Sequence, residues 1–277
     1  MIKDLIYDVG LHEGQDTAYY LQRGFRVVAV EANPELVKAA ERRFTQALAS
    51  KRLVIVGAAI AGRDGEGDFW VCDSETAWSS SHRDIASRRG APHHKVTVPQ
   101  VRFGRLLEKT GTPFYLKIDI EESDALCLED LSRGDLPAYL SFELTHVELI
   151  ERAAALGYRD FKLVDQFSHC AITFPPTPEY RAYRVRQRIL RSRRLPLRVF
   201  RKLGGRSLLI ALDKRSRSRS GWYFAFGSSG PFGEDAPGPW LSSEQVRRGY
   251  LRHKEMCSAA SDLEGGVWCD IHARSVP

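Results

Sequence analysis

Two short stretches decide the fold: YDVGLHEG at residues 7–14 and VAVEANP at residues 28–34. The first contains an apolar strand, expected over residues 5–9, that runs directly into the pattern Gly-x-x-x-Gly formed by Gly10 and Gly14. Glycine has no Cβ and tolerates left-handed φ, so these residues let the backbone turn tightly and let a ligand approach the main chain. We therefore expect a binding turn directly after the first strand.

The second stretch completes a β-α-β unit. A helix is expected over residues 16–23, and it stops at Gly24. A second strand over residues 26–30 then ends at Glu31. A carboxylate at this place can accept hydrogen bonds from both ribose hydroxyls of a bound nucleoside. The unit therefore predicts a nucleoside-cofactor site.

Acidic residues around the turn indicate which cofactor it binds. The G-x-G-x-x-G pattern of dinucleotide enzymes is absent, and Asp8, Glu13 and Asp16 would repel a pyrophosphate. They suit the ammonium and sulfonium groups of S-adenosylmethionine. The residues predicted to bind this cofactor are Asp8, Gly10, His12, Gly14, Glu31 and Ala32.

A third motif, YLKIDIE at residues 115–121, adds a family resemblance. Together with the first two stretches it resembles the FkbM-type S-adenosylmethionine-dependent methyltransferases over residues 5–166. The family usually continues with Gly, a small residue and Glu, whereas this chain has Glu122, Ser123 and Asp124. The resemblance implies an O-methyltransferase that acts on a hydroxyl of a sugar or another small molecule.

The expected fold is α/β, a Rossmann-like class I methyltransferase fold with a mainly parallel seven-stranded sheet and helices on both faces. One domain, 1–277, is expected to comprise a cofactor-binding core at 1–166, a basic insertion or lid at 167–221, and a last strand, Gly/Pro loop and C-terminal helix at 222–277. Further strands are expected at 53–57, 68–72, 95–101, 114–118, 139–142, 161–164 and 222–226, with 68–72 returning from 53–57 as a hairpin. Further helices are expected at 34–49, 103–109, 123–131, 147–156 and 243–256.

Composition places the chain among cytoplasmic proteins. No apolar run approaches the ~18 residues of a membrane span, and the N-terminus leads directly into a strand, so we expect no signal peptide. The five cysteines are scattered without a Cys-x-x-Cys pair, which favours reduced thiols over a disulfide framework or a zinc site.

Charge is concentrated in one segment. Residues 181–219 contain fifteen Lys or Arg and one acid, Asp213, a net charge of +14, which leaves −8 for the rest of a chain whose total is +6. Three interpretations stay open: a solvated helix face, contact with anionic lipid or an anionic substrate at a membrane periphery, and binding of nucleic acid by an RNA-directed methyltransferase or binding module. Few aromatic residues for base stacking lie in the segment, which disfavours nucleic acid.

Catalytic candidates follow two buried strands. Asp119 and Glu121 come after residues 114–118, and Glu143 and His146 come after residues 139–142. Methyl transfer to a hydroxyl requires alignment and removal of a proton, so we predict Asp119, Glu121 and His146 as catalytic residues. Asp119, Glu121 and Glu143 could also hold Mg²⁺, a metal that the sequence permits but does not predict.

A rival interpretation comes from Tyr158 and Lys162, which match the Tyr-x-x-x-Lys of short-chain dehydrogenases that use NAD(P). That motif must lie on a helix. Here Gly157 is expected to end a helix, and residues 161–164 are expected to form a strand. The dehydrogenase is therefore the less favoured alternative.

Overall fold

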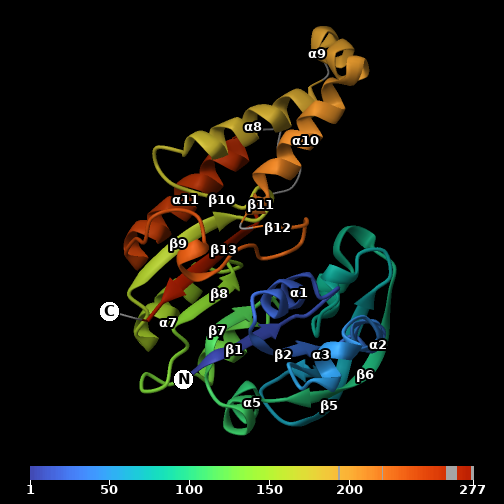
Figure 1. The fold of residues 1–277 in the computed structure, drawn as a ribbon, viewed down its shortest axis with the longest axis vertical. Helices are drawn as coiled ribbons and strands as arrows, with labels where there is room; N and C mark the ends of the chain where they lie inside the picture. Colours follow the sequence, from blue (N-terminus) through green and yellow to red (C-terminus); the bar gives the residue numbers. More distant parts are fainter. Residues whose placement is uncertain (193, 220, 260–266, 276–277) are drawn as a thin grey trace. The chain divides into compact units, whose positions relative to one another are not determined.

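The structure is a computed structural model that describes residues 1–192, 194–219, 221–259 and 267–275. The chain divides into two compact units (Figure 1). Unit 1 comprises Met1–Arg159 with Ala273–Pro277, and unit 2 comprises Asp160–His272.

A parallel sheet forms the centre of unit 1. Its strands lie in the order β8-β7-β1-β2-β3 and pair in parallel. The strands are β1 Ile2–Val9, β2 Arg26–Glu31, β3 Leu53–Gly57, β7 Pro113–Ile118 and β8 Tyr139–Glu143. The register sets Val9 beside Val30 on β2 and Ile118 on β7, so the carboxyl ends of these strands share one edge. Such an order is typical of doubly wound α/β sheets, which bind ligands at that edge.

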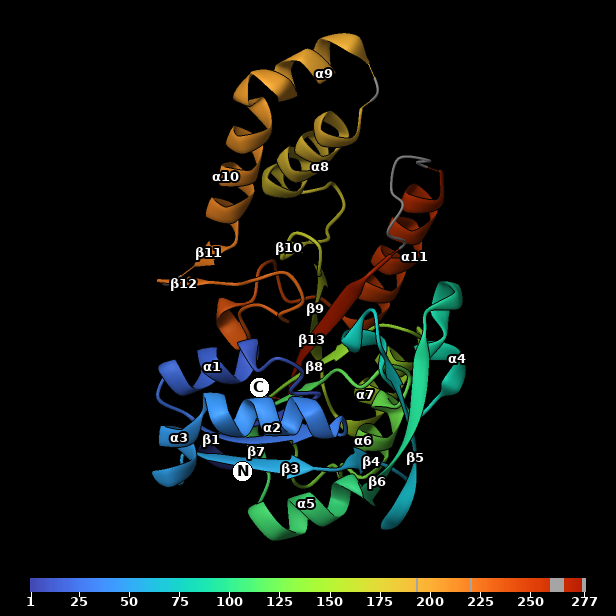
Figure 2. The same cartoon turned by 90° about the vertical axis from the view of Figure 1, so that its right-hand side faces the viewer.

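Helices cover both faces of this sheet. Figure 2 shows α1 and α2 on one face and α5 on the other. The helices of unit 1 are α1 Gln15–Gln22, α2 Pro34–Arg43, α3 Thr45–Ala49, α4 Arg83–Ala86, α5 Phe103–Thr110, α6 Asp124–Glu129 and α7 Glu148–Leu156, with 3-10 turns η1 Thr76–Trp78 and η2 Arg88–Gly90. Both faces are covered, so most of the buried strand residues are apolar, as at residues 27–30 of β2.

The ends of two helices agree with their sequence signals. The side chain of Asn33 accepts a hydrogen bond from Glu35 N at 3.0 Å and caps α2. Gly157, with φ of 123°, ends α7. The single helix predicted at 34–49 is wrong, because the backbone leaves the helical region at Phe44 and the chain continues as α3.

A second sheet in unit 1 corrects the predicted hairpin. Its strands are β4 Ala59–Ile60, β5 Gly65–Cys72 and β6 His93–Val101, in the order β4-β6-β5. Residues 68–72 do form a strand, but its antiparallel partner is β6 and not the strand at 53–57. Phe69, Val71 and Val98 pack with Ala59 into a small core of their own, which explains the separate sheet.

Unit 2 contains the basic segment. Its elements are β9 Asp160–Asp165, β10 Cys170–Ala171, α8 Pro178–Arg191, α9 Leu195–Phe200, the π-helical turn η3 Arg201–Gly205, α10 Arg206–Ser216, β11 Ser218–Arg219, β12 Trp222–Tyr223, the 3-10 turn η4 Gly233–Asp235, α11 Ser243–Ala259 and β13 Cys269–Arg274, whose last two residues belong to unit 1. The figures show α8 and α10 side by side with α9 at their common end (Figures 1 and 2). None of the described helices is long and apolar enough to cross a membrane.

The last strand of the sheet is not the one that the sequence predicts. Residues 222–226 contribute only β12, which pairs with β11 in a sheet of two strands. The strand beside β9 is β13. Asp270 and His272 alternate with the apolar residues of β13, so the sequence of this strand resembles a polar tail. Both side chains are nevertheless buried.

Candidate cofactor and active site

The glycine turn connects β1 to α1 beside the end of β2. The main-chain amides of Gly10 and Leu11 both donate to the carbonyl of Val30, at 3.0 and 2.9 Å. Gly10 has φ of 89°, and a Cβ there would lie 1.9 Å from the carbonyl oxygen of Asp119. The missing side chain therefore admits the main chain that follows β7, a structural role beyond the predicted approach of a ligand.

Glu31 ties the two turns together. One carboxylate oxygen accepts from the amide of His12 and the other from the amide of Asn33, both at 2.8 Å. Burial raises the pKa of Glu31, and these two amides oppose the shift. A carboxylate has about four lone-pair positions, so each oxygen can accept one further hydrogen bond, as from a hydroxyl. The imidazole of His12 lies 2.9 Å from Thr76 Oγ1.

A buried lysine lies at the centre of the sheet edge. Lys117 Nζ donates to the carbonyl of Gly10 at 2.7 Å and lies 3.1 Å from Asp8, 3.6 Å from Asp119 and 3.9 Å from Asp16. Burial opposes its charge, but the three carboxylates outweigh burial and raise the pKa of Lys117. Three carboxylates around one ammonium carry a formal net charge of −2. An added cation is therefore favoured beside the turn.

The chain after β7 brings further carboxylates to this edge. Glu121 and Glu122 have φ of 46° and 72°, a left-handed pair in which Glu122 occupies the position where the resembling family has glycine. Glu121 forms an ion pair with Arg88 at 2.9 Å. Burial raises the pKa of Glu121 to about 7, although Arg88 opposes the shift. Such strain is common at functional sites.

Asp124 and Glu143, which are not among the three predicted catalytic residues, also belong to this cluster of carboxyl side chains, which we call the carboxyl cluster. Asp124 is 1% exposed, and among the described residues no hydrogen-bond partner meets either of its carboxylate oxygens. Burial, with the charge of Asp119 next, raises the pKa of Asp124 to about 8. Burial and the charges of Asp119, Glu121 and Asp124 also raise the pKa of Glu143. The ends of β7 and β8 thus concentrate carboxyl groups, and their raised pKa values favour the protonated, neutral form of Asp124 and Glu143 at neutral pH.

The predicted catalytic residues are not equivalent in the structure. Asp119 and Glu121 lie in the carboxyl cluster, and the side chain of Asp119 is 33% exposed. The side chain of His146 is 67% exposed and lies 3.0 Å from Glu122. Across the described residues, no three His, Cys, Asp or Glu side chains form a group suited to a metal ion, so the Mg²⁺ alternative gains no support.

Sequence reasoning missed three contributors: Lys117 as the central charge, Arg88 as the partner of Glu121, and the buried Asp124. An ionisable residue inside an apolar strand, as at Lys117, is itself a signal of a paired buried charge. No sequence spacing connects Arg88 to Glu121. The dehydrogenase alternative lacks its helix, because Tyr158 follows the end of α7 and Lys162 lies in strand β9.

Comparison with solved structures gives distant likenesses. The chain resembles a precorrin-6y C5,15-methyltransferase from Geobacter metallireducens, at 12% identity over 59% of this chain and 69% of that chain, with a TM-score of 0.36. It also resembles a TehB-like SAM-dependent methyltransferase from Corynebacterium glutamicum, at 10% identity over 59% and 71%, with a TM-score of 0.34. No curated protein sequence matches the chain.

The family model of the FkbM methyltransferase domain matches residues 8–184, more than half of the 277 residues. The glycine turn, Glu31 and the Lys117 motif all lie inside this range. The strand order of unit 1 agrees with a Rossmann-like class I methyltransferase fold, and the family supports methyl transfer from S-adenosylmethionine. The chain therefore belongs to the FkbM methyltransferase family.

Proposed function

We propose that this protein methylates a hydroxyl oxygen of a small molecule or glycan. The observation that supports S-adenosylmethionine as the methyl donor is the formal charge of −2 around Lys117, which is 3% exposed and lies beside the glycine turn. The hydroxyl acceptor is what the family resemblance implies. S-adenosylmethionine supplies a methyl group on a positively charged sulfur and also has an ammonium group. The residues of this edge fit such a cation better than they fit a pyrophosphate.

The proposed cofactor contacts divide into two kinds. Glu31 accepts the ribose hydroxyls through its remaining lone pairs, and the main chain of Gly10, His12, Gly14 and Ala32 lines the turn. Asp8 acts through its charge, since it is fully buried and already bonded to Thr17 at 2.6 Å and to Lys117.

For the acceptor, we assign proton removal to Asp119. Its carboxylate is the partly exposed member of the group around Lys117, whereas Glu121 is held by Arg88. Lys117 fixes the Asp119 carboxylate from the buried side, so the open side can accept a proton from an aligned hydroxyl. Glu121 and His146 are the alternative bases. Glu121 requires its ionised form for this role, and His146 would act from the surface.

The cofactor assignment is tested by titrating the purified protein with S-adenosylhomocysteine and, separately, with NADPH in a calorimeter. Binding of S-adenosylhomocysteine alone is expected, because the turn has excess negative charge. Binding of NADPH alone would reverse the assignment and return the dehydrogenase.

The base is tested by Asp119→Asn, with transfer of a labelled methyl group to a panel of hydroxylated acceptors as the measurement. Turnover should fall by roughly 10²–10⁴-fold while affinity for S-adenosylhomocysteine persists. Glu148→Gln, an exposed acid in the first turn of α7, is the matched control and should keep full activity.

The pH profile of kcat/KM separates the alternatives. If Glu121 is the base, the rate should rise through about pH 7, because the carboxylate form is required and the pKa of Glu121 is raised to about 7. Full activity of Asp119→Asn together with that profile would transfer the role to Glu121. Loss of activity in His146→Ala alone would transfer it to His146.

A further inference from the structure

Apolar side chains are exposed along one edge of α9 and the turn that follows it. Leu195, Val199 and Leu203 are 70%, 47% and 82% exposed. Leu195 and Val199 are four residues apart on α9 and so share one face of this helix. Leu203 follows at the same spacing in η3, where the backbone leaves the helical region. An apolar stripe open to solvent is a common mark of an interaction surface.

A basic stripe runs directly beside the apolar one. Arg194, Arg198 and Lys202 each precede one member of the apolar stripe, and all three are exposed. Among the described residues, no carboxylate forms an ion pair with any of the three. We call the two sets together the α9 double stripe: Arg194, Arg198 and Lys202 with Leu195, Val199 and Leu203.

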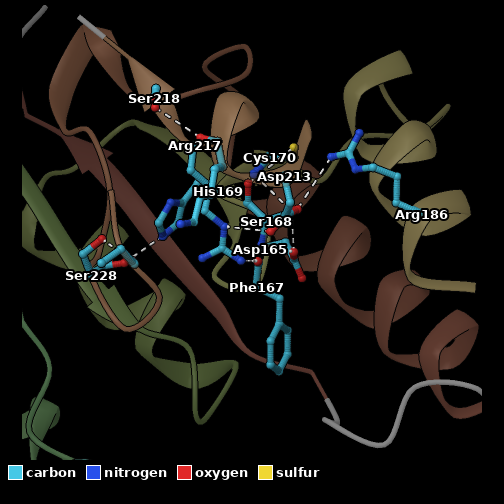
Figure 3. Close-up of polar contacts among 12 residues, drawn as sticks. Asp165, Phe167, Ser168, His169, Cys170, Arg186, Asp213, Arg217, Ser218 and Ser228 are labelled. Atoms are coloured by element: carbon cyan, nitrogen blue, oxygen red, sulfur yellow. Dashed lines mark hydrogen bonds and ion pairs between the residues drawn. The ribbon is translucent and has the colours of Figure 1, made fainter. Parts of the chain in front are cut away.

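Other basic residues of the same segment are used inside unit 2. Figure 3 shows Asp213 between Arg186 and Arg217, with Nη2 of Arg186 at 3.7 Å and Nε of Arg217 at 3.4 Å. Arg217 also donates to the carbonyl of Phe167, after β9. These contacts fix α8 and α10 at their base, away from the double stripe.

Helices α8 and α10, with α9 and η3 at their common end, form a helical hairpin that we call the basic hairpin, and Arg201 holds its end. Its Nη1 donates to the carbonyls of Ile189 and Ser192, both at 2.6 Å, and so ties η3 back to the end of α8. Arg201 therefore has a structural role and is separate from the double stripe. The stripes are presented on a held turn, with their charges and apolar groups directed to solvent.

We propose that the α9 double stripe binds a membrane surface that contains anionic phospholipids. The apolar stripe enters the boundary between headgroups and acyl chains, and the basic stripe contacts the phosphate-bearing headgroups. Charge complementarity selects the anionic lipid. The exposed leucines favour a bilayer over nucleic acid, because a phosphate backbone offers no apolar region in which they can be buried. Phe200 is the one aromatic residue of α9, too few for a base-stacking surface. This inference does not depend on the proposed reaction.

The test is co-sedimentation of the full-length protein with vesicles of phosphatidylcholine, alone or mixed with phosphatidylglycerol. Binding is expected only to the mixed vesicles and should weaken as salt rises. The triple variant Arg194→Ala/Arg198→Ala/Lys202→Ala should reduce partitioning by roughly 100-fold, since each basic residue contributes about fivefold near an anionic surface. Lys51→Ala/Arg63→Ala/Lys109→Ala removes the same charge from exposed positions of unit 1 and should change partitioning little.

A second variant tests the apolar stripe. Leu195→Ser/Leu203→Ser should reduce partitioning by at least about tenfold, because both side chains leave water on binding. Val54→Ser/Leu251→Ser, at exposed positions outside the hairpin, is the matched control. Unchanged circular dichroism and unchanged affinity for S-adenosylhomocysteine would establish that all four variants are folded.

Three results would overturn the proposal. One is a wild-type protein that does not sediment with the mixed vesicles. Another is a gel shift with RNA that the basic triple variant loses and the leucine variant keeps, which assigns the surface to nucleic acid. The third is a dimer in light scattering that the leucine variant dissociates, which assigns the stripe to a second copy of the chain.

Discussion

The sheet edge of unit 1 and the basic hairpin of unit 2 are opposites in charge. In unit 1 one cation, Lys117, lies among three carboxylates, and its side chain is 3% exposed. In unit 2 one acid, Asp213, lies between two arginines, and its side chain is 22% exposed. Lys117 and Asp213 each hold oppositely charged side chains together, but only Lys117 does so out of contact with water.

The difference shows how burial changes the meaning of a charge excess. The buried excess at Lys117 is poorly screened, so it favours a specific cation beside the glycine turn. The excess at the hairpin is positive, exposed and screened by salt, so it favours an extended anionic surface. The two regions should therefore respond very differently to loss of their central residue.

The largest effect is expected from Lys117→Met, which leaves Asp8, Asp16 and Asp119 without their shared cation. Breaking a buried ion pair in this way typically costs about 3–5 kcal/mol of unfolding free energy. Urea denaturation measures the loss, and Lys109→Met, an exposed lysine at the end of α5, should stay within about 0.5 kcal/mol of wild type. A loss below about 1 kcal/mol in Lys117→Met would show that water screens the ion pairs of Lys117 as it screens exposed ones.

Next comes Glu31→Ala, which should weaken binding of S-adenosylhomocysteine by about 1.5–3 kcal/mol, the range for hydrogen bonds to a charged group. The variant also removes the acceptor of the amides of His12 and Asn33, so the turn should loosen. Glu31→Gln keeps the shape of the side chain, and its affinity for S-adenosylhomocysteine in calorimetry should lie between those of wild type and Glu31→Ala. Wild-type affinity in a folded Glu31→Ala would remove Glu31 from the cofactor site.

Asp124→Asn tests whether the Asp124 carboxyl is buried, through the pH dependence of stability. The folded pKa of Asp124 is raised to about 8, above its unfolded value, so its contribution to stability is present at low pH and is lost as pH rises toward about 8. Asparagine cannot ionise, so the unfolding free energy of the variant should exceed that of wild type by about 1–3 kcal/mol at about pH 8. At about pH 4, close to the pKa of the unfolded side chain, the two should differ little.

Urea denaturation at both pH values checks this, with Glu148→Gln as an exposed control that should leave the pH dependence unchanged. Equal pH slopes in Asp124→Asn and wild type would contradict the buried, unpartnered placement of Asp124. Glu121 and Glu143 should preserve part of the slope in the variant, because their pKa values are raised as well.

The smallest effect is expected from Asp213→Asn. Its carboxylate is partly exposed, so loss of the pairs with Arg186 and Arg217 should cost about 1 kcal/mol or less and should shrink as salt rises. Thermal unfolding at low and high salt measures it. A loss as large as that of Lys117→Met would make the two regions alike and remove the contrast between them.

Local spacing in the sequence determined the first β-α-β unit and the strands around it. The strand at residues 53–57 is β3 with the same bounds, Asn33 caps α2, and Gly157 ends α7. These features depend on neighbours within a few residues, where apolar periodicity and capping side chains act directly. The family of the chain followed from motifs of the same short range.

Only the tertiary structure decided which residues meet at long range. β13 is the last strand although Asp270 and His272 interrupt its pattern, and β5 pairs with β6 instead of β3. Arg88 reaches Glu121 across more than thirty positions of sequence. Burial of a polar residue and the partner of a charge depend on packing between distant segments. Such packing leaves no fixed spacing in the sequence, because the chain can close loops of many lengths at similar cost.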